Sequence, residues 1–167
     1  MRPASQSGFT LVELMIVVLL IGILAALSAP FLIAAKSAAN ESSAIGSLKA
    51  VNSGQATFAS VCGSGGYTLQ LATLVTERFA SPDVDLSPKS GFAFVLAAGA
   101  GSAAGPLDCA AEPTQSGYYF TAEPISATTG RRGFATNQRG TVWQDSTGAI
   151  PTEPFATSPT VGPLDSQ

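Results

Sequence analysis

The sequence contains no histidine, and its 167 residues include only two cysteines and 11% charged residues. Without histidine, Ser-His-Asp and Cys-His catalytic arrangements are impossible. Two cysteines alone do not supply the four ligands of a structural zinc site. The net charge is −3 without any basic block, which argues against broad electrostatic binding of nucleic acid but leaves room for a small basic patch. These absences predict a protein that is not an enzyme and holds neither a metal nor a cofactor.

One long apolar run is present near the start of the chain, from Phe9 to Ala35, and Glu13 is its only formally charged residue. About 20 apolar residues are enough to cross a bilayer as a helix. A carboxylate inside such a segment is costly in a membrane and therefore indicates a function. Residues 1–8 (MRPASQSG) are short and polar, which is typical of a targeting or processing segment.

The stretch GFTLVELMIVVLLIGILAALSAP, residues 8–30, resembles the N-terminus of type IV pilins and type II secretion pseudopilins, which carry class III signal sequences. The resemblance implies that a prepilin peptidase cleaves after Gly8 on the cytoplasmic side and methylates the new N-terminus, Phe9. Glu13 stands at the acidic position of the family, and Pro30 falls where many members have a helix-disturbing proline.

An ordinary secretory signal, cleaved near Ala26-Leu27-Ser28, is the competing interpretation of this segment. Such signals have an apolar run of about 7–15 residues. The run here is longer and holds Glu13, which an ordinary signal has no reason to contain. The class III interpretation is therefore favoured.

A physical argument supports the roles implied for Phe9 and Glu13. Cleavage leaves an ammonium group on Phe9, and the Glu13 carboxylate lies about one helical turn away. When subunits stack with a small axial offset, Glu13 of one subunit can neutralise the ammonium of its neighbour. A half-made pair is strongly unfavourable in a low-dielectric core, so the pair favours one register of assembly. The alternative is an unpaired Glu13 that reaches the membrane surface.

Pro30 and Gly22 are expected to weaken the helix. Proline lacks a backbone donor and clashes with the carbonyl four residues earlier, and glycine is a poor helix former. We therefore expect residues 22–30 to extend when a subunit leaves the lipid for a filament.

The rest of the chain predicts an α+β, pilin-like fold. Residues 36–61 keep an apolar stripe at helical spacing, with Glu41 and Lys49 facing away from it. One helix from about Thr10 to about Ser60 is expected, ended by the glycines of residues 63–66.

A short helix is predicted at residues 69–75, and residues 102–113 are expected to form an irregular connection. The helix from about Thr10 would pack on an antiparallel sheet of three to four strands. Those strands are expected at residues 92–96, 118–122, 134–136 and 141–144.

The expected layout of the chain has five parts. They are a leader at residues 1–8, a membrane-spanning assembly helix at 9–35, its amphipathic continuation at 36–61, a globular region at 62–150 and a Pro-rich tail, extended or disordered, at 151–167.

Cys62 and Cys109 are expected to form a disulfide if the region after residue 35 is exported, because disulfides persist in oxidising compartments. Two separate buried thiols are the alternative.

Arg131, Arg132 and Arg139 are expected to cluster at one hairpin end. They are interpreted either as surface charges of a solvated turn or as a contact patch for DNA or a neighbouring subunit. Single-stranded DNA contacts need interleaved aromatic residues, although such residues are more often sheet core. Four aromatic residues are expected nearby: Tyr118, Tyr119, Phe134 and Trp143.

Two acidic stretches are weak candidates for cation binding. Asp83 and Asp85 lack the spacing of a calcium loop, so a solvated loop is expected there. The stretch 145–148 (DSTG) is a poor match for the acidic calcium loop that is usual in major secretion pseudopilins. This departure favours a pilus subunit over a pseudopilin.

The resemblance implies a structural subunit that forms a filament for adhesion, motility or DNA uptake. The alternatives are a pseudopilin of a type II secretion system and a minor pilin that binds DNA or another ligand. The implied partners are the prepilin peptidase, other pilin subunits, an inner-membrane platform protein and an assembly ATPase. The precursor would cross the bacterial inner membrane once, with its C-terminal domain outside the cytoplasm, before joining a surface pilus or a periplasmic pseudopilus.

Mass spectrometry of the mature protein tests the expected cleavage. We expect a chain that begins at Phe9 and carries a methyl group on its amine. A chain beginning at Met1 would contradict the class III interpretation, and one beginning at Ala29 would support the secretory signal instead.

Overall fold

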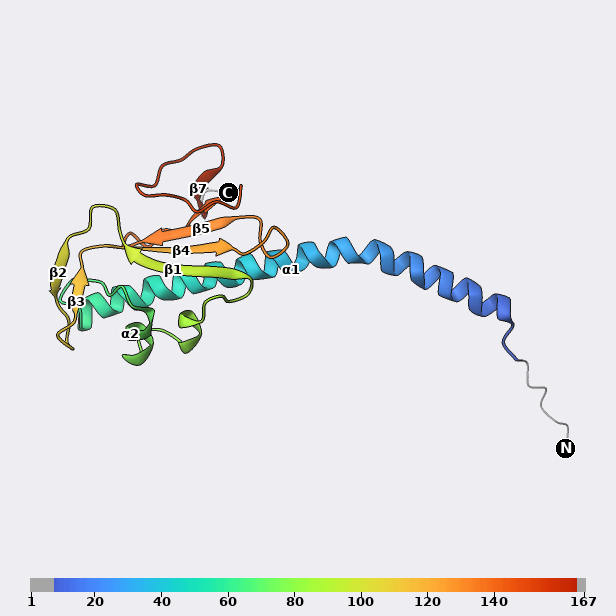
Figure 1. Ribbon diagram of the computed structural model, residues 1–167, viewed down its shortest axis with the longest axis horizontal. Coiled ribbons are helices and arrows are strands. Elements are labelled where there is room, and N and C mark those ends of the chain that lie inside the picture. Colours follow the sequence, from blue (N-terminus) through green and yellow to red (C-terminus); the bar gives the residue numbers. More distant parts are fainter. Residues whose placement is uncertain (1–7, 165–167) are drawn as a thin grey trace, which may run out of the picture. The chain divides into compact units, whose positions relative to one another are not determined.

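A computed structural model describes residues 8–164, so the expected leader lies, apart from Gly8, outside the described residues. The chain divides into two compact units, Met1–Ala35 and Lys36–Gln167. Helix α1 (Leu11–Val61) belongs to both units (Figure 1). The other elements are α2 (Leu71–Thr76), the 3-10 helix η1 (Pro82–Asp85), β1 (Phe92–Ala98), β2 (Ala104–Leu107), β3 (Pro113–Gln115), β4 (Tyr118–Pro124), β5 (Gly133–Asn137), β6 (Trp143–Asp145) and β7 (Val161–Pro163).

The expected long helix is confirmed as α1, which is 51 residues long. It ends where the amides of Cys62 and Gly63 both donate to the carbonyl of Phe58, at 2.9 and 2.7 Å. Gly65 follows with a φ of +91°, a conformation that glycine adopts without steric penalty. A Cβ on Gly63 would lie 2.2 Å from the carbonyl oxygen of Gly66. The glycines of residues 63–66 therefore end the helix, as predicted.

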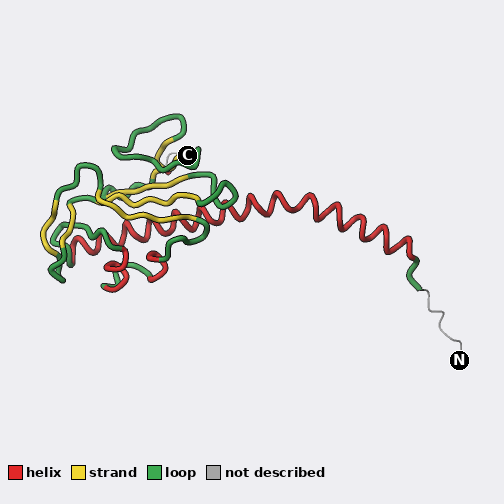
Figure 2. The backbone as a smooth tube through the Cα atoms, viewed as in Figure 1, coloured by secondary structure: helices red, strands yellow, loops and turns green. Residues whose placement is uncertain are grey.

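The main sheet has five strands rather than the predicted three to four, in the order β1-β4-β5-β6-β7 with every pair antiparallel. Figure 2 shows its strands in yellow. The additional strand is β7, which lies in the predicted Pro-rich tail and pairs Pro163 with Trp143 of β6. Proline is tolerated on an edge strand because it lacks only one ladder donor. Residues 102–113 also differ from the predicted irregular connection, because β2 within them pairs with β3 in a small second sheet.

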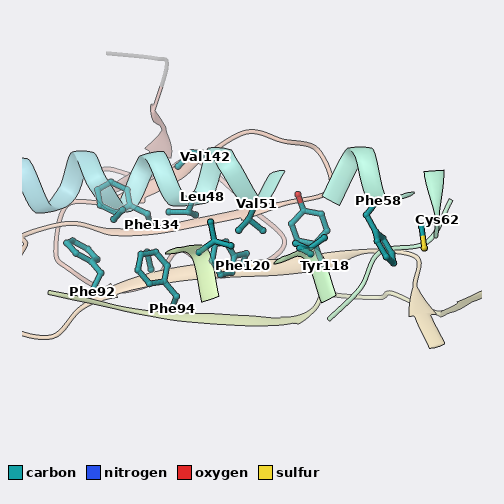
Figure 3. Packing of buried hydrophobic residues seen from close by; sticks show 14 residues of the cluster. Leu48, Val51, Phe58, Cys62, Phe92, Phe94, Tyr118, Phe120, Phe134 and Val142 are labelled. Atoms are coloured by element: carbon teal, nitrogen blue, oxygen red, sulfur yellow. The ribbon is translucent and has the colours of Figure 1, made fainter. Parts of the chain in front are cut away.

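The core of the Lys36–Gln167 unit lies between α1 and the inner face of the sheet. Leu48, Val51 and Phe58 of α1 are completely buried, and their side chains point toward the strands (Figure 3). Phe120 of β4 and Phe134 of β5 are completely buried as well. Each such side chain stabilises the fold by about 1.5–3 kcal/mol through removal of apolar area from water.

Glu41 is buried, although the helical pattern predicted it to face away from the apolar stripe. Its Oε1 accepts hydrogen bonds from the backbone amides of Arg131 and Arg132, at 2.7 and 3.2 Å. Its Oε2 accepts from Nε of the Arg132 guanidinium at 2.9 Å and forms an ion pair with Nη2 at 2.8 Å. The carboxylate thus attaches α1 to the chain that enters β5. Lys49 is exposed, as the helical pattern predicted.

Residues 146–160, which we call the C-terminal strap, cover part of the outer face of the sheet. The Tyr119 hydroxyl donates to the carbonyl of Pro151, and the Phe155 ring lies between those of Tyr119 and Trp143. Ala135, an outward-facing residue of β5 beneath the strap, is completely buried. Burial raises the pKa of the Tyr119 hydroxyl to about 12, and the nearby carboxylate of Glu153 adds to the shift.

Cys62 and Cys109 form the expected disulfide, with their Cα atoms 5.0 Å apart and a sequence separation of 47. It joins the end of α1 to the connection between β2 and β3. On the chain-entropy model, closing a loop of this length stabilises the folded state by about 4 kcal/mol.

Replacing Glu41 tests the attachment of α1 to the β4–β5 connection. We expect Glu41→Ala to lower the free energy of unfolding by about 3 kcal/mol, because the Arg132 guanidinium and two backbone amides lose their acceptor. Denaturant unfolding of the mature protein in detergent measures the change. The matched control is Glu77→Ala, which removes an exposed carboxylate and is expected to change stability by less than about 0.5 kcal/mol. Equal effects of the two variants would contradict this account.

Candidate processing and assembly segment

The bond between Gly8 and Phe9 lies just before α1, in exposed and non-helical chain. A Cβ built on Gly8 would have no atom within 4 Å. A peptidase needs an extended and accessible backbone at the bond it cuts, and glycine offers the least hindrance. The Gly8–Phe9 bond is non-helical and accessible in this structure.

Thr10 is the N-cap of α1, a role that the sequence analysis missed. Its Oγ1 accepts a hydrogen bond from the Glu13 amide at 3.2 Å, and its carbonyl accepts from the Leu14 amide at 3.2 Å. Thr10-Leu11-Val12-Glu13 has the spacing of a capping box, in which a threonine caps the amide of an acidic residue three positions later. That spacing is visible in the sequence and could have predicted where the helix begins.

Glu13 lies in the first turn of α1 and is exposed. A carboxylate is favourable there because the N-terminal end of a helix carries a partial positive charge. The ion pairs within residues 8–164 are those of Asp83 with Lys89 and Glu41 with Arg132. Within the described residues, Glu13 therefore has no cation of its own chain.

The apolar surface of residues 8–35 is almost entirely exposed. Phe9 is 79% exposed and Phe31 is 75% exposed. An 18-residue window of α1 has a mean hydropathy of 2.8, and none of that window is buried within the fold. The core helix of a soluble protein would be mostly buried. By length and composition, this helix is able to cross a membrane.

Pro30 lies inside α1, and the helix is continuous through it. Because proline has no amide hydrogen, the Ala26 carbonyl lacks its usual helical donor. The Ser28 hydroxyl donates to the Leu24 carbonyl at 2.8 Å, a type of bond that slightly destabilises helices. Both features lie in the segment 22–30, whose extension in a filament stays a prediction.

The model of the prokaryotic N-terminal methylation motif matches residues 3–29. The chain carries the class III signal of type IV pilins. This match includes the Gly8–Phe9 bond, Thr10 and Glu13, and it ends just before Pro30. Comparison of the chain with curated proteins and with solved structures gives no significant match.

The sequence predicted that three arginines of the Lys36–Gln167 unit cluster at one hairpin end. Arg131 and Arg132 precede β5, whereas Arg139 follows it in the turn to β6. The structure therefore does not bring the three side chains together at one hairpin end. The Arg132 side chain is also occupied, because it bonds Glu41 and donates from Nη1 to Gln144 at 2.7 Å.

The four aromatic residues expected near the arginines divide between the two faces of the sheet. Tyr118 and Phe134 are buried in the core. Tyr119 and Trp143 lie on the outer face beneath the C-terminal strap. Of the arginines, Arg139 is the one that lines the same hollow as Trp143.

The two acidic stretches have partners within the protein. Asp83 forms an ion pair with Lys89, and the hydrogen bond from Lys89 lowers the pKa of the Asp83 carboxyl. Oδ1 of Asp145 accepts from the amide and the hydroxyl of Thr147, at 2.9 and 2.7 Å. Such bonds from aspartate to the residue two positions later stabilise a turn.

Replacing Thr10 tests the cap of α1. We expect Thr10→Ala to raise the hydrogen-exchange rate of the Glu13 amide by about fivefold, because loss of an N-cap typically costs about 1 kcal/mol. Exchange is measured by NMR on the mature protein in detergent micelles. Thr10→Ser keeps the acceptor oxygen and serves as the matched control. Equal exchange rates in the two variants would contradict the role of Thr10.

Proposed function

We propose that this protein is a structural subunit of the type IV pilin kind, cleaved between Gly8 and Phe9 and polymerised through α1. The observation that carries the proposal is the pairing of the methylation motif with an apolar helical surface that nothing in the described chain covers. An exposed apolar surface of this extent requires lipid or other protein. In the membrane, lipid would cover this surface. After filament assembly, the helices of other subunits would cover it.

The charges at the start of the helix support this order of events. Cleavage creates an ammonium group on Phe9, and Glu13 has no cation of its own chain among the described residues. In a filament, the Glu13 carboxylate of one subunit would pair with the Phe9 ammonium of the next. Since an unpaired charge is strongly unfavourable in an apolar bundle, packing with a shifted register is disfavoured.

Processing and assembly define the partners of the subunit. A prepilin peptidase would cut and methylate it, and an inner-membrane platform protein with an assembly ATPase would move it into a filament of pilin subunits. The precursor would be held in the inner membrane by residues 9–35, with the Lys36–Gln167 unit outside the cytoplasm. The disulfide between Cys62 and Cys109 supports this location, because disulfides persist outside the cytoplasm.

A pseudopilin of a type II secretion system is the alternative that shares the same N-terminal segment. The stretch 145–148 favours the pilus over it, because this stretch is a poor match for the acidic calcium loop that is usual in major secretion pseudopilins. The DNA-binding minor pilin has weaker support, since β5 separates Arg139 from Arg131 and Arg132.

Substitution of Glu13 tests the proposal in cells that contain the assembly system. We expect Glu13→Ala to leave a cleaved, membrane-held subunit and to lower the yield of sheared filaments by about tenfold or more, because the neighbouring ammonium would be left unpaired. Immunoblots of membrane and sheared fractions measure the two pools.

Glu77→Ala removes an exposed carboxylate of the Lys36–Gln167 unit and is the matched control, for which normal filament yield is expected. Normal filament yield from Glu13→Ala would exclude the proposed charge pair. Absence of cleaved subunit in that variant would instead place Glu13 in recognition by the peptidase.

A further inference from the structure

A hollow of about 260 Å³ lies on the outer face of the sheet, between the β5–β6 turn and the C-terminal strap. Arg139 and Thr141 from the turn and Trp143 from β6 line one part of it. Glu153 and Phe155 from the strap line the other. All of these residues belong to the Lys36–Gln167 unit, and none belongs to the helical surface proposed for assembly.

The strap side of the hollow is held in place by specific contacts. Oε1 of Glu153 accepts from the Asn137 side-chain amide, and Oε2 accepts from the Ala100 backbone amide, both at 2.6 Å. The Phe155 ring stacks on Trp143 with ring centroids 5.2 Å apart and an interplanar angle of 15°. A site whose walls are already bonded loses little conformational freedom when a ligand binds.

Several polar groups of the hollow are not used by the fold. The side chains of Arg139, Thr141 and Trp143 form no hydrogen bond with any other residue of the described chain. The guanidinium and the indole N–H are donors, and the threonine hydroxyl both donates and accepts. Each carboxylate oxygen of Glu153 keeps a further lone pair beyond the bond it already accepts. Donors and acceptors therefore surround an aromatic surface.

We propose that this hollow binds a single carbohydrate ring. Sugar hydroxyls both donate and accept, which matches the mixture of Arg139, Thr141 and Glu153, and the apolar C–H face of the ring would stack on Trp143. The volume is below the range of about 300–1,000 Å³ that drug-sized ligands occupy, which suits one ring. A simple anion is a poorer match because Glu153 offsets the charge of Arg139, and an aliphatic chain would leave the polar groups unpaired.

Binding of a sugar would add recognition to the proposed assembly, and it does not depend on filament formation. It would give a filament subunit a site for glycans of a surface or matrix. Failure of the Glu13 experiment and failure of the sugar experiment are therefore distinguishable.

The chain provides its own probe, because Trp143 is its one tryptophan. Its fluorescence is recorded on the mature full-length protein in a detergent without a sugar headgroup. The titrants are glucose, galactose, N-acetylglucosamine and glucuronate, and polysaccharides built from the same rings. We expect at least one of these sugars to cause a saturable change in Trp143 emission. A saturable response to a free monosaccharide would indicate that the hollow binds a free sugar. A response to polysaccharide alone would indicate that it binds a ring within a polymer.

Two exposed arginines provide the matched variants. We expect Arg139→Ala to weaken sugar binding by about tenfold, the usual effect of losing hydrogen bonds to a charged group. We expect Arg131→Ala, with the same loss of charge at the other end of β5, to bind normally. Unfolding curves show whether Arg139→Ala stays folded, which is expected because its side chain has no partner in the described chain.

Three results would overturn the proposal. They are the absence of a saturable change with every sugar, an equal loss of binding in Arg131→Ala, and a response to inorganic phosphate that the sugars do not reproduce.

Discussion

The apolar surface of residues 9–35 has no partner within the described chain, and this constraint governs the rest of the molecule. Such a surface is stable only in lipid or against other copies of the helix. The methylation motif, matched at residues 3–29, overlaps it, and Thr10 caps the first turn, so that the helix begins just after the proposed cleavage bond. The one carboxylate of the run, Glu13, lies at the helix N-terminus, where the backbone favours a negative charge. The proposed cleavage, membrane insertion and assembly would thus concern the same few residues.

The second half of α1, residues 36–61, contributes side chains to the core of the Lys36–Gln167 unit. Leu48, Val51 and Phe58 bury apolar area against the sheet, while Glu41 bonds the chain that enters β5. Apolar packing has little directional preference, whereas a carboxylate with three donors and an ion pair specifies position. The disulfide of Cys62 adds a covalent attachment at the end of the helix. The Lys36–Gln167 unit therefore holds its segment of α1 by contacts that do not involve the apolar segment before it.

The C-terminal strap covers part of the outer face of the sheet. Its anchors are the Tyr119 hydroxyl on Pro151 and Glu153 on Asn137, and Phe155 packs against the rings of Tyr119 and Trp143. These contacts leave Arg139 and Trp143 at the rim of a hollow whose walls are fixed by other residues. An arrangement that stabilises the sheet thus also forms the hollow proposed to bind a sugar, from residues that the proposed assembly surface does not include.

The class III signal, the membrane-length helix and its end were determined by the sequence alone, because periodicity, glycines and the Thr10–Glu13 spacing act between residues close in the chain. Four of the five strands were also predictable from their alternation and turns. Only the tertiary structure decided the rest. Glu41 is buried because it meets Arg132, a residue 91 positions later. Strand β7 exists because β6 offers it an edge, and β5 keeps Arg139 apart from the other two arginines. No local pattern contains such contacts, since they depend on which distant segments the fold brings side by side.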